Sequence, residues 1–210
     1  MASNVSIILT ESDSLIQKKI NAALSKELNN SLNKSLKRIQ RAVESIVRTA
    51  VDSSPEIASL RGGTLKLDFG LVGDHTMDIV NAISNSVFVT MKPVRLVGQS
   101  ISGGISVAIQ PEDYSLLLSL PAARQLTERG VSLPWLDWLL NLGDTLIIAD
   151  FGVQYGPYGR TGGAHMISKN RPYKVDTRYS GTASDNFITR ALSRSHKQIG
   201  EAIVTSIRSA

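Results

Sequence analysis

The sequence predicts an α+β fold: a long N-terminal helix, an antiparallel β-sheet with short helices, and a C-terminal helix packed on the sheet. Three observations support this. The first 54 residues contain neither glycine nor proline, which favours a helix. Residues 64–149 hold short stretches of alternating apolar and polar side chains between glycines and prolines. Residues 187–210 return to helical spacing, and the order helix, strands, helix is typical of the α+β class.

The first helix is expected over residues 14–52. Ser12 or Asp13 could cap its start, and Pro55 would end it, because the residue before a proline avoids helical geometry. Asn29-Asn30 could divide it into two helices. An apolar stripe runs down the second half, and a weaker one precedes it; the members are Leu32, Leu36, Ile39, Val43, Ile46 and Ala50, preceded by Leu15, Ile20, Leu24 and Leu28. A continuous helix would be about 55–60 Å long, so part of it should pack on something else.

The middle of the chain predicts strands and one short helix. Residues 64–72 alternate as a strand with Leu65, Leu67 and Phe69 on one face, and residues 74–85 follow as a helix. Residues 86–97 form a strand with a bulge at Pro93. Gly103-Gly104 should then turn the chain into a return strand over residues 105–109.

The remaining elements are shorter. Residues 111–129 suit either strand or helix, whereas residues 134–140 predict a helix that Gly143 ends. Residues 145–149 predict a buried strand, and residues 152–163 a loop rich in glycine and tyrosine. Ser184-Asp185-Asn186 should cap the last helix. Its apolar side is Ile188, Ala191, Leu192, Ile199, Ile203 and Ile207.

Composition excludes several kinds of site. The chain has no cysteine, so it has no disulfides, thiolate metal sites or thiol nucleophiles, which suits a reducing cytosol. Its three histidines lie far apart in sequence, so we expect no metal site and no cofactor. No apolar run is long enough to cross a membrane, and the start does not read as a secretory signal. We therefore expect a soluble protein without membrane contact.

No catalytic constellation is evident. Asp68-Phe69-Gly70 and Asp150-Phe151-Gly152 spell the magnesium tripeptide of kinases, but the catalytic-loop signature is absent and the chain is too short. The glycine-rich loop ends in Gly163-Ala164 instead of the Gly-Lys-Ser/Thr of a phosphate-binding loop. We expect no catalytic residue and no enzyme activity, although an unrecognised serine and histidine site stays open as a third hypothesis.

Charge is distributed unevenly along the chain. Residues 1–52 carry 8 basic and 5 acidic side chains, residues 53–159 carry 6 and 10, and residues 160–210 carry 9 and 3. Basic ends around an acidic middle favour oriented contact between subunits or with a polyanion. A basic stripe lies beside the apolar one on the first helix: Lys34, Arg38, Arg41 and Arg48. It is either a solvated helix face or a surface for DNA or an acidic neighbour.

The glycine-rich loop supplies the other candidate interface residues. Tyr155, Tyr158 and Arg160 combine a large contact area with a polar tip, which is typical of interface residues. An unremarkable surface loop is the alternative. A non-specific nucleic-acid-binding module that uses the basic helix and the C-terminal region is the competing function. It would bind with an affinity that falls steeply with salt.

Four segments in order resemble the neck and tail-completion proteins of tailed phages, of the lambda minor tail protein Z type and the T-even-like neck type. The first ends the long helix at residues 49–55 (TAVDSSP) and continues at 59–65 (SLRGGTL). The second covers residues 133–144 (LPWLDWLLNLGD). The third joins residues 147–152 (IIADFG) to 159–166 (GRTGGAHM), and the fourth opens the last helix at 186–192 (NFITRAL).

This resemblance implies a structural virion protein that forms a ring, expected to be hexameric, at the head–tail junction. It implies an N-terminal helical extension over residues 1–54 and an α+β neck or tail-completion domain over residues 55–210. The expected partners are copies of the chain and other neck, connector and tail proteins of the virion, with possible non-specific contact with DNA in the channel. The protein would be assembled in the host cytoplasm and reside in the virion.

Overall fold

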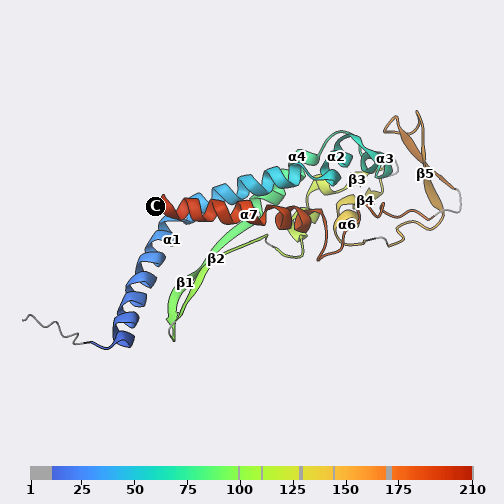
Figure 1. Cartoon of the computed structure of the whole chain (residues 1–210). Coiled ribbons are helices and arrows are strands. Elements are labelled where there is room, and N and C mark those ends of the chain that lie inside the picture. The colour runs from blue at the N-terminus through green and yellow to red at the C-terminus, as the bar shows by residue number, and fades with distance from the viewer. Residues whose placement is uncertain are drawn as a thin grey trace, which may run out of the picture.

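The computed structural model describes residues 11–98, 100–109, 111–127, 130–143, 145–168 and 172–209, and it confirms a mixed helix and sheet fold (Figure 1). The helices are α1 (Asp13–Asp52), α2 (Pro55–Gly62), α3 (Thr64–Asp68), α4 (Thr76–Asn85), α5 (Ser115–Leu118), the 3-10 helix η1 (Pro121–Ala123), α6 (Trp135–Leu140) and α7 (Phe187–Arg208). The strands are β1 (Val87–Val97), β2 (Ser100–Ile109), β3 (Gln125–Leu126), β4 (Ser132–Leu133), β5 (Phe151–Tyr155) and β6 (Ala164–Ser168). Within the described ranges they form three antiparallel two-stranded sheets, β1–β2, β3–β4 and β5–β6.

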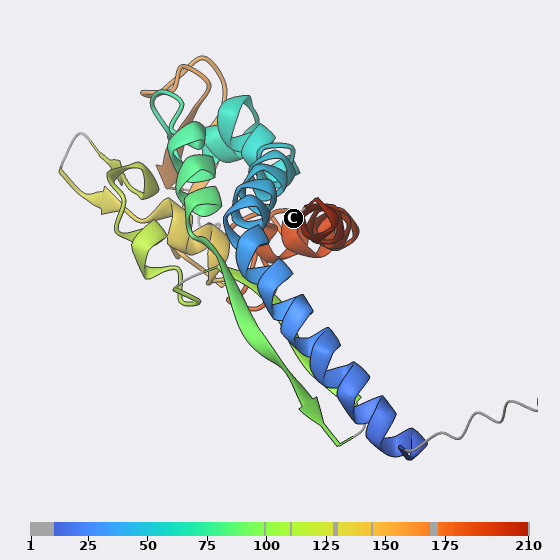
Figure 2. The same ribbon diagram turned by 90° about the vertical axis from the view of Figure 1, so that its left-hand side faces the viewer.

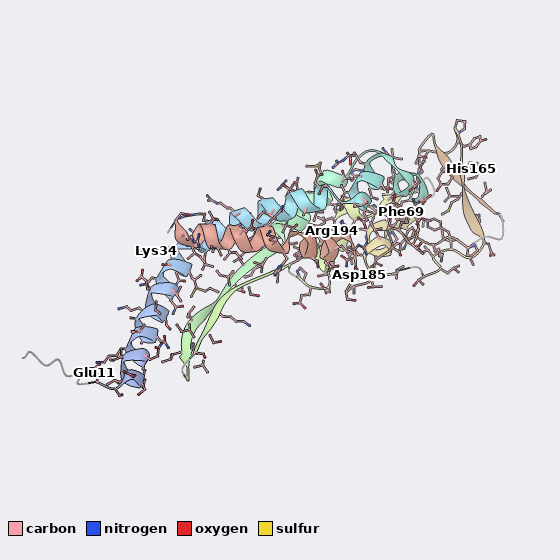
Figure 3. The ribbon with its side chains drawn as sticks, viewed as in Figure 1. Glu11, Lys34, Phe69, His165, Asp185 and Arg194 are labelled. Atoms are coloured by element: carbon pink, nitrogen blue, oxygen red, sulfur yellow. The ribbon has the colours of Figure 1, made fainter. Side chains whose placement is uncertain are left out.

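The molecule is elongated because α1 is long and only its second half joins the body. With 40 residues, α1 spans about 60 Å at 1.5 Å per residue. Figure 1 shows it bending beneath the end of α7, near Lys34 as labelled in Figure 3. The helix is uninterrupted, so Asn29-Asn30 do not divide it. Residues 13–30 of α1 and the β1–β2 hairpin project away from the body and run together in Figure 2; we call this projection the arm.

The core forms around the second half of α1. Ile39, Val43, Val47 and Val51 have no exposed surface, and they pack with α4 and the Phe69 and Trp135 region of the body. The predicted stripe is therefore rotated: Val47 and Val51 are buried, whereas Ile46 and Ala50 are only half-buried. Because these core residues lie before residue 54, the second half of α1 is a structural part of the body. The domain boundary at residue 54 stays a prediction.

The β1–β2 hairpin is bound to α1 by side-chain amides. Gln40 donates to the Val87 carbonyl (2.6 Å) and accepts from the Val89 amide (2.9 Å). Asn29 makes the same pair of bonds with Val94, at 2.9 and 2.8 Å. The two residues are eleven apart, close to three helical turns, so both face the same edge of β1. They fill the place that a third strand would otherwise take.

The turn of this hairpin differs from the prediction. The bulge near Pro93 is confirmed, between Lys92 and Arg95 in the strand register. Gly103-Gly104, however, lie inside β2, which begins at Ser100. A Cβ on Gly103 would come within 2.6 Å of the Val94 Cα, so Gly103 permits the close approach at the bulge, and neither glycine makes the turn.

Two predicted strands are wrong. Residues 64–68 form helix α3, and both Leu65 and Phe69 lie in the core. A spacing of four residues places two side chains on one face of a helix and also on one face of a strand, so the pattern fits both structures. Residues 145–149 form no strand; they contribute one isolated bridge, in which Ile148 and Tyr173 exchange backbone bonds of 2.7 and 3.3 Å. The glycine-rich loop is also shorter than predicted, because residues 152–155 belong to β5.

The C-terminal helix α7 is capped as predicted and packs against this framework, chiefly along α1. The Asn186 side chain accepts from the amides of Ile188 (3.0 Å) and Thr189 (3.2 Å) at the start of α7. At the other end, Arg38 of α1 donates to the Ser209 carbonyl at 2.9 Å. Arg190 forms an ion pair with the buried Glu56 at 2.9 Å, which fixes α7 to α2.

Candidate assembly surfaces

The arm carries an uncovered apolar ridge. Ile20, Leu24 and Leu28 follow one another at steps of four residues on α1, and they are 49%, 48% and 40% exposed. In the same half of the helix the buried side chains are polar, namely Asn21 and Ser25. These three large apolar side chains thus face solvent, whereas the two buried side chains beside them are polar. Such a contiguous exposed apolar surface is typical of an interaction site. We call Ile20, Leu24 and Leu28 the ridge.

The total surface of the chain is large for its mass. The accessible surface is 12901 Å², whereas a compact monomer of 22.7 kDa exposes about 9,500 Å². The arm that projects from the body contributes to this large surface (Figures 1 and 2).

A groove lies at the opposite end of the molecule, between α3, the β3–β4 turn and the β5–β6 hairpin. Its volume is about 530 Å³. Six large apolar side chains line it: Leu67, Phe69, Val131, Leu133, Val153 and Met166. At its outer part Val131 is 55% and Met166 40% exposed. Figure 3 places His165, which also lines the groove, at the far end of the molecule from Glu11 at the start of α1.

Polar contacts fix the walls of the groove. Arg160 donates to the carbonyls of Gly70 (2.8 Å) and Leu126 (3.2 Å), which ties the β5–β6 turn to α3 and to β3. The Tyr155 hydroxyl donates to the Asp68 carboxylate at 2.5 Å. A Cβ on Gly163 would come within 2.7 Å of the Leu67 side chain, so this glycine lets β6 approach α3 closely. The groove is therefore held open by bonds from three separate segments.

Burial is the main cause of the pKa shifts of Asp68 and Tyr155 beside the groove. Burial raises the pKa of Asp68, and the hydrogen bond from Tyr155 offsets this only in part. Burial and the neighbouring Asp68 raise the pKa of Tyr155. The buried Nδ1 of His165 finds no hydrogen-bond partner among the described residues. The groove is thus mainly apolar, with a few polar atoms at its wall.

The predicted interface residues fall into two separate groups. Tyr155, Tyr158 and Arg160 lie together on the β5–β6 hairpin, where the two tyrosines are about half exposed. Tyr158 rests edge-on against His165, with ring centroids 4.9 Å apart. Arg160 donates hydrogen bonds to the carbonyls of Gly70 and Leu126, so its role in the fold is structural.

The second group lies on the middle of α1. Lys34, Arg38, Arg41 and Arg48 are all exposed on the helix face away from the core. Two of them already contact other elements, since Arg38 bonds to Ser209 and Arg48 to Asn81 of α4. The structure does not bring this group together with the tyrosines.

The sequence indicated the ridge but not the groove. The residues of the ridge were visible as the weaker stripe upstream of the main one. The groove is built from segments up to about a hundred residues apart, and Val131 and Met166 look like ordinary strand residues in the sequence. No pattern within a single segment could have revealed it.

Two further findings concern sites that depend on residue clusters. In the described part of the chain, no three His, Asp or Glu side chains are grouped so that they could hold a metal ion. Among the same residues no helix has the length and apolar character needed to span a membrane. No family model, no curated protein and no solved structure matches this chain significantly.

Proposed function

We propose that this chain is a non-enzymatic structural protein of a tailed-phage virion, one subunit of a ring at the head–tail junction. The four sequence segments that resemble neck and tail-completion proteins support the location. The uncovered ridge of the arm carries the assembly part of the proposal. A chain that worked alone would avoid unwanted association better with polar side chains at Ile20, Leu24 and Leu28.

The size of the ridge sets what it can contribute. Full burial of one large aliphatic side chain contributes about 1.5–3 kcal/mol, so covering the exposed halves of the three ridge side chains contributes roughly 2–4 kcal/mol. A micromolar complex needs about 8 kcal/mol. The ridge must therefore act together with further surface. A closed ring adds a second contact for every subunit, which strengthens the assembly without new chemistry.

The mass of the protein in solution tests the proposal. Sedimentation of the wild-type chain over a range of concentrations should show an oligomer. Leu24→Glu should weaken the association at least 100-fold, because it places a charge at the centre of the ridge. The matched control is Ala22→Glu, which adds the same charge to the same arm at an exposed position on the helix face away from the ridge.

Two results would contradict the proposal. One is a wild-type chain that stays monomeric up to high concentration. The other is a Leu24→Glu variant that assembles as well as the control does. Negative-stain images of the wild-type oligomer then distinguish a ring from an open filament.

A further inference from the structure

We propose that the ridge of one copy inserts into the groove of the next copy, so that copies join head to tail. The inference rests on the proposed function and names the two surfaces that meet. The ridge is Ile20, Leu24 and Leu28, and the groove is lined by Leu67, Phe69, Val131, Leu133, Val153 and Met166.

The two surfaces cannot meet within one chain. The second half of α1 is fixed in the core by Ile39, Val43 and Val47, and the arm continues the same uninterrupted helix away from the body. Figure 3 shows Glu11 and His165 at opposite ends of the molecule. Any contact between ridge and groove must therefore join two copies.

The shapes and chemistry of the two surfaces agree. Three side chains at steps of four residues form a row about 12 Å long on one helix face. An amphipathic helix that lays such a row into an apolar groove is a recurrent mode of recognition. The groove, at about 530 Å³, lies within the range of pockets that take a ligand the size of several side chains.

The alternative arrangement leaves more apolar surface exposed. If two ridges packed against each other, the contact would be symmetric and would produce a closed pair. Val131, Met166 and the neighbouring Leu126, which is 65% exposed, would then remain open to solvent at both ends of the pair. Ridge-to-groove contact covers both surfaces with one interface, and because it is not symmetric it continues from copy to copy, into a ring if the rotation closes.

Two variants, each with one of the two surfaces disabled, test the contact between ridge and groove. Leu24→Glu disables the ridge and leaves the groove intact. Val131→Glu disables the groove and leaves the ridge intact. The substitution at Val131 should be tolerated, because the backbone of this residue keeps its bonds to Thr127 and its side chain is exposed. Circular dichroism of each variant checks that the fold is retained.

The head-to-tail contact predicts a specific result on mixing. Each variant alone should be monomeric, with association weakened at least 100-fold. An equimolar mixture should form a 1:1 heterodimer and nothing larger, because one intact ridge and one intact groove remain. Sedimentation or native mass spectrometry measures this.

The other outcomes separate the inference from the proposed function. If Val131→Glu assembles like the wild type, the groove is not the contact and the inference is overturned, while the ring proposal stands. A mixture that stays monomeric although the wild type assembles overturns the inference in the same way. A wild-type chain that never assembles overturns both.

Discussion

At the scale of single residues, Asn29 and Gln40 make the arm possible. A two-stranded hairpin alone is only marginally stable in water, and its edges expose unpaired backbone groups. The two amides pair with the outer edge of β1 at both ends of the strand, at distances of 2.6–2.9 Å. They thereby join helix and hairpin into one unit and close an edge that could otherwise recruit another strand.

Replacing one of these amides should loosen the arm. Gln40→Leu leaves the Val87 carbonyl and the Val89 amide without partners, and we expect a loss of about 1–3 kcal/mol in the free energy of unfolding. Urea denaturation measures it. Gln17→Leu is the control, since Gln17 is an exposed amide on the same helix that bonds to Asn21. Equal losses for the two variants would show that the contacts of Gln40 to β1 contribute nothing specific.

Asp68 should give the groove a dependence on pH. Its pKa is raised above the ordinary value of 3.8, chiefly by burial, so the folded state prefers the protonated carboxyl. The stability that Asp68 contributes is present at low pH and is lost as the pH rises through its raised pKa. Asp68→Asn resembles the protonated form and can still accept the Tyr155 hydroxyl.

The difference in unfolding free energy between Asp68→Asn and the wild type isolates this effect, because all other titrating groups are common to both. From pH 3.5 to pH 7 this difference should move in favour of the variant. Thermal denaturation at several pH values measures it. A difference that moves in favour of the wild type would mean that the pKa of Asp68 is lowered, contrary to the structure.

At the scale of elements, the two long helices begin differently. Asn186 is fully buried, and its side chain accepts from two amides of α7 while it donates to the Thr182 carbonyl and the Tyr114 hydroxyl. Ser12 precedes α1 without a side-chain cap bond to the helix backbone, and its exposed hydroxyl pairs with the neighbouring Ser14 hydroxyl at 3.1 Å. The start of α7 is thus fixed to the body, whereas the start of α1 is not.

Removing each cap should therefore have unequal effects. Asn186→Ala should lower the free energy of unfolding by about 2 kcal/mol, at the upper end of the range for caps, since it also leaves buried partners unsatisfied. Ser12→Ala should change it by less than about 0.5 kcal/mol. Chemical denaturation compares the two. A larger loss for Ser12→Ala would contradict the view that the start of α1 projects freely.

The same scale shows what the sequence could and could not predict. The long helices and the bulged strand β1 were predictable because their apolar period extends over many residues. Residues 64–68 were not, since Leu65 and Phe69 satisfy both a strand and a helical pattern over so short a stretch. Residues 145–149 pair with Tyr173, a partner 25 residues away, and no local pattern carries that information.

At the scale of the whole molecule, the two ends of the chain differ: the arm lies at one end, and the β5–β6 hairpin, which lines the groove, lies at the other (Figure 1). The uncovered stripe on α1 was visible in the sequence because it lies within one helix. The groove was not, because its walls meet only in the folded chain. The two surfaces together support assembly into a ring in which every subunit offers the same two ends.

The most direct test of the central claim is the rate at which a thiol at the centre of the ridge reacts. The chain has no cysteine, so Leu24→Cys introduces a single reporter, and Ala22→Cys provides the control on the helix face away from the ridge. If other subunits cover the ridge, labelling of Leu24→Cys should be fast in dilute protein and slow in concentrated protein, while labelling of Ala22→Cys should change far less. Equal rates for Leu24→Cys at every concentration would show that the ridge stays in solvent, and the assembly account would be wrong.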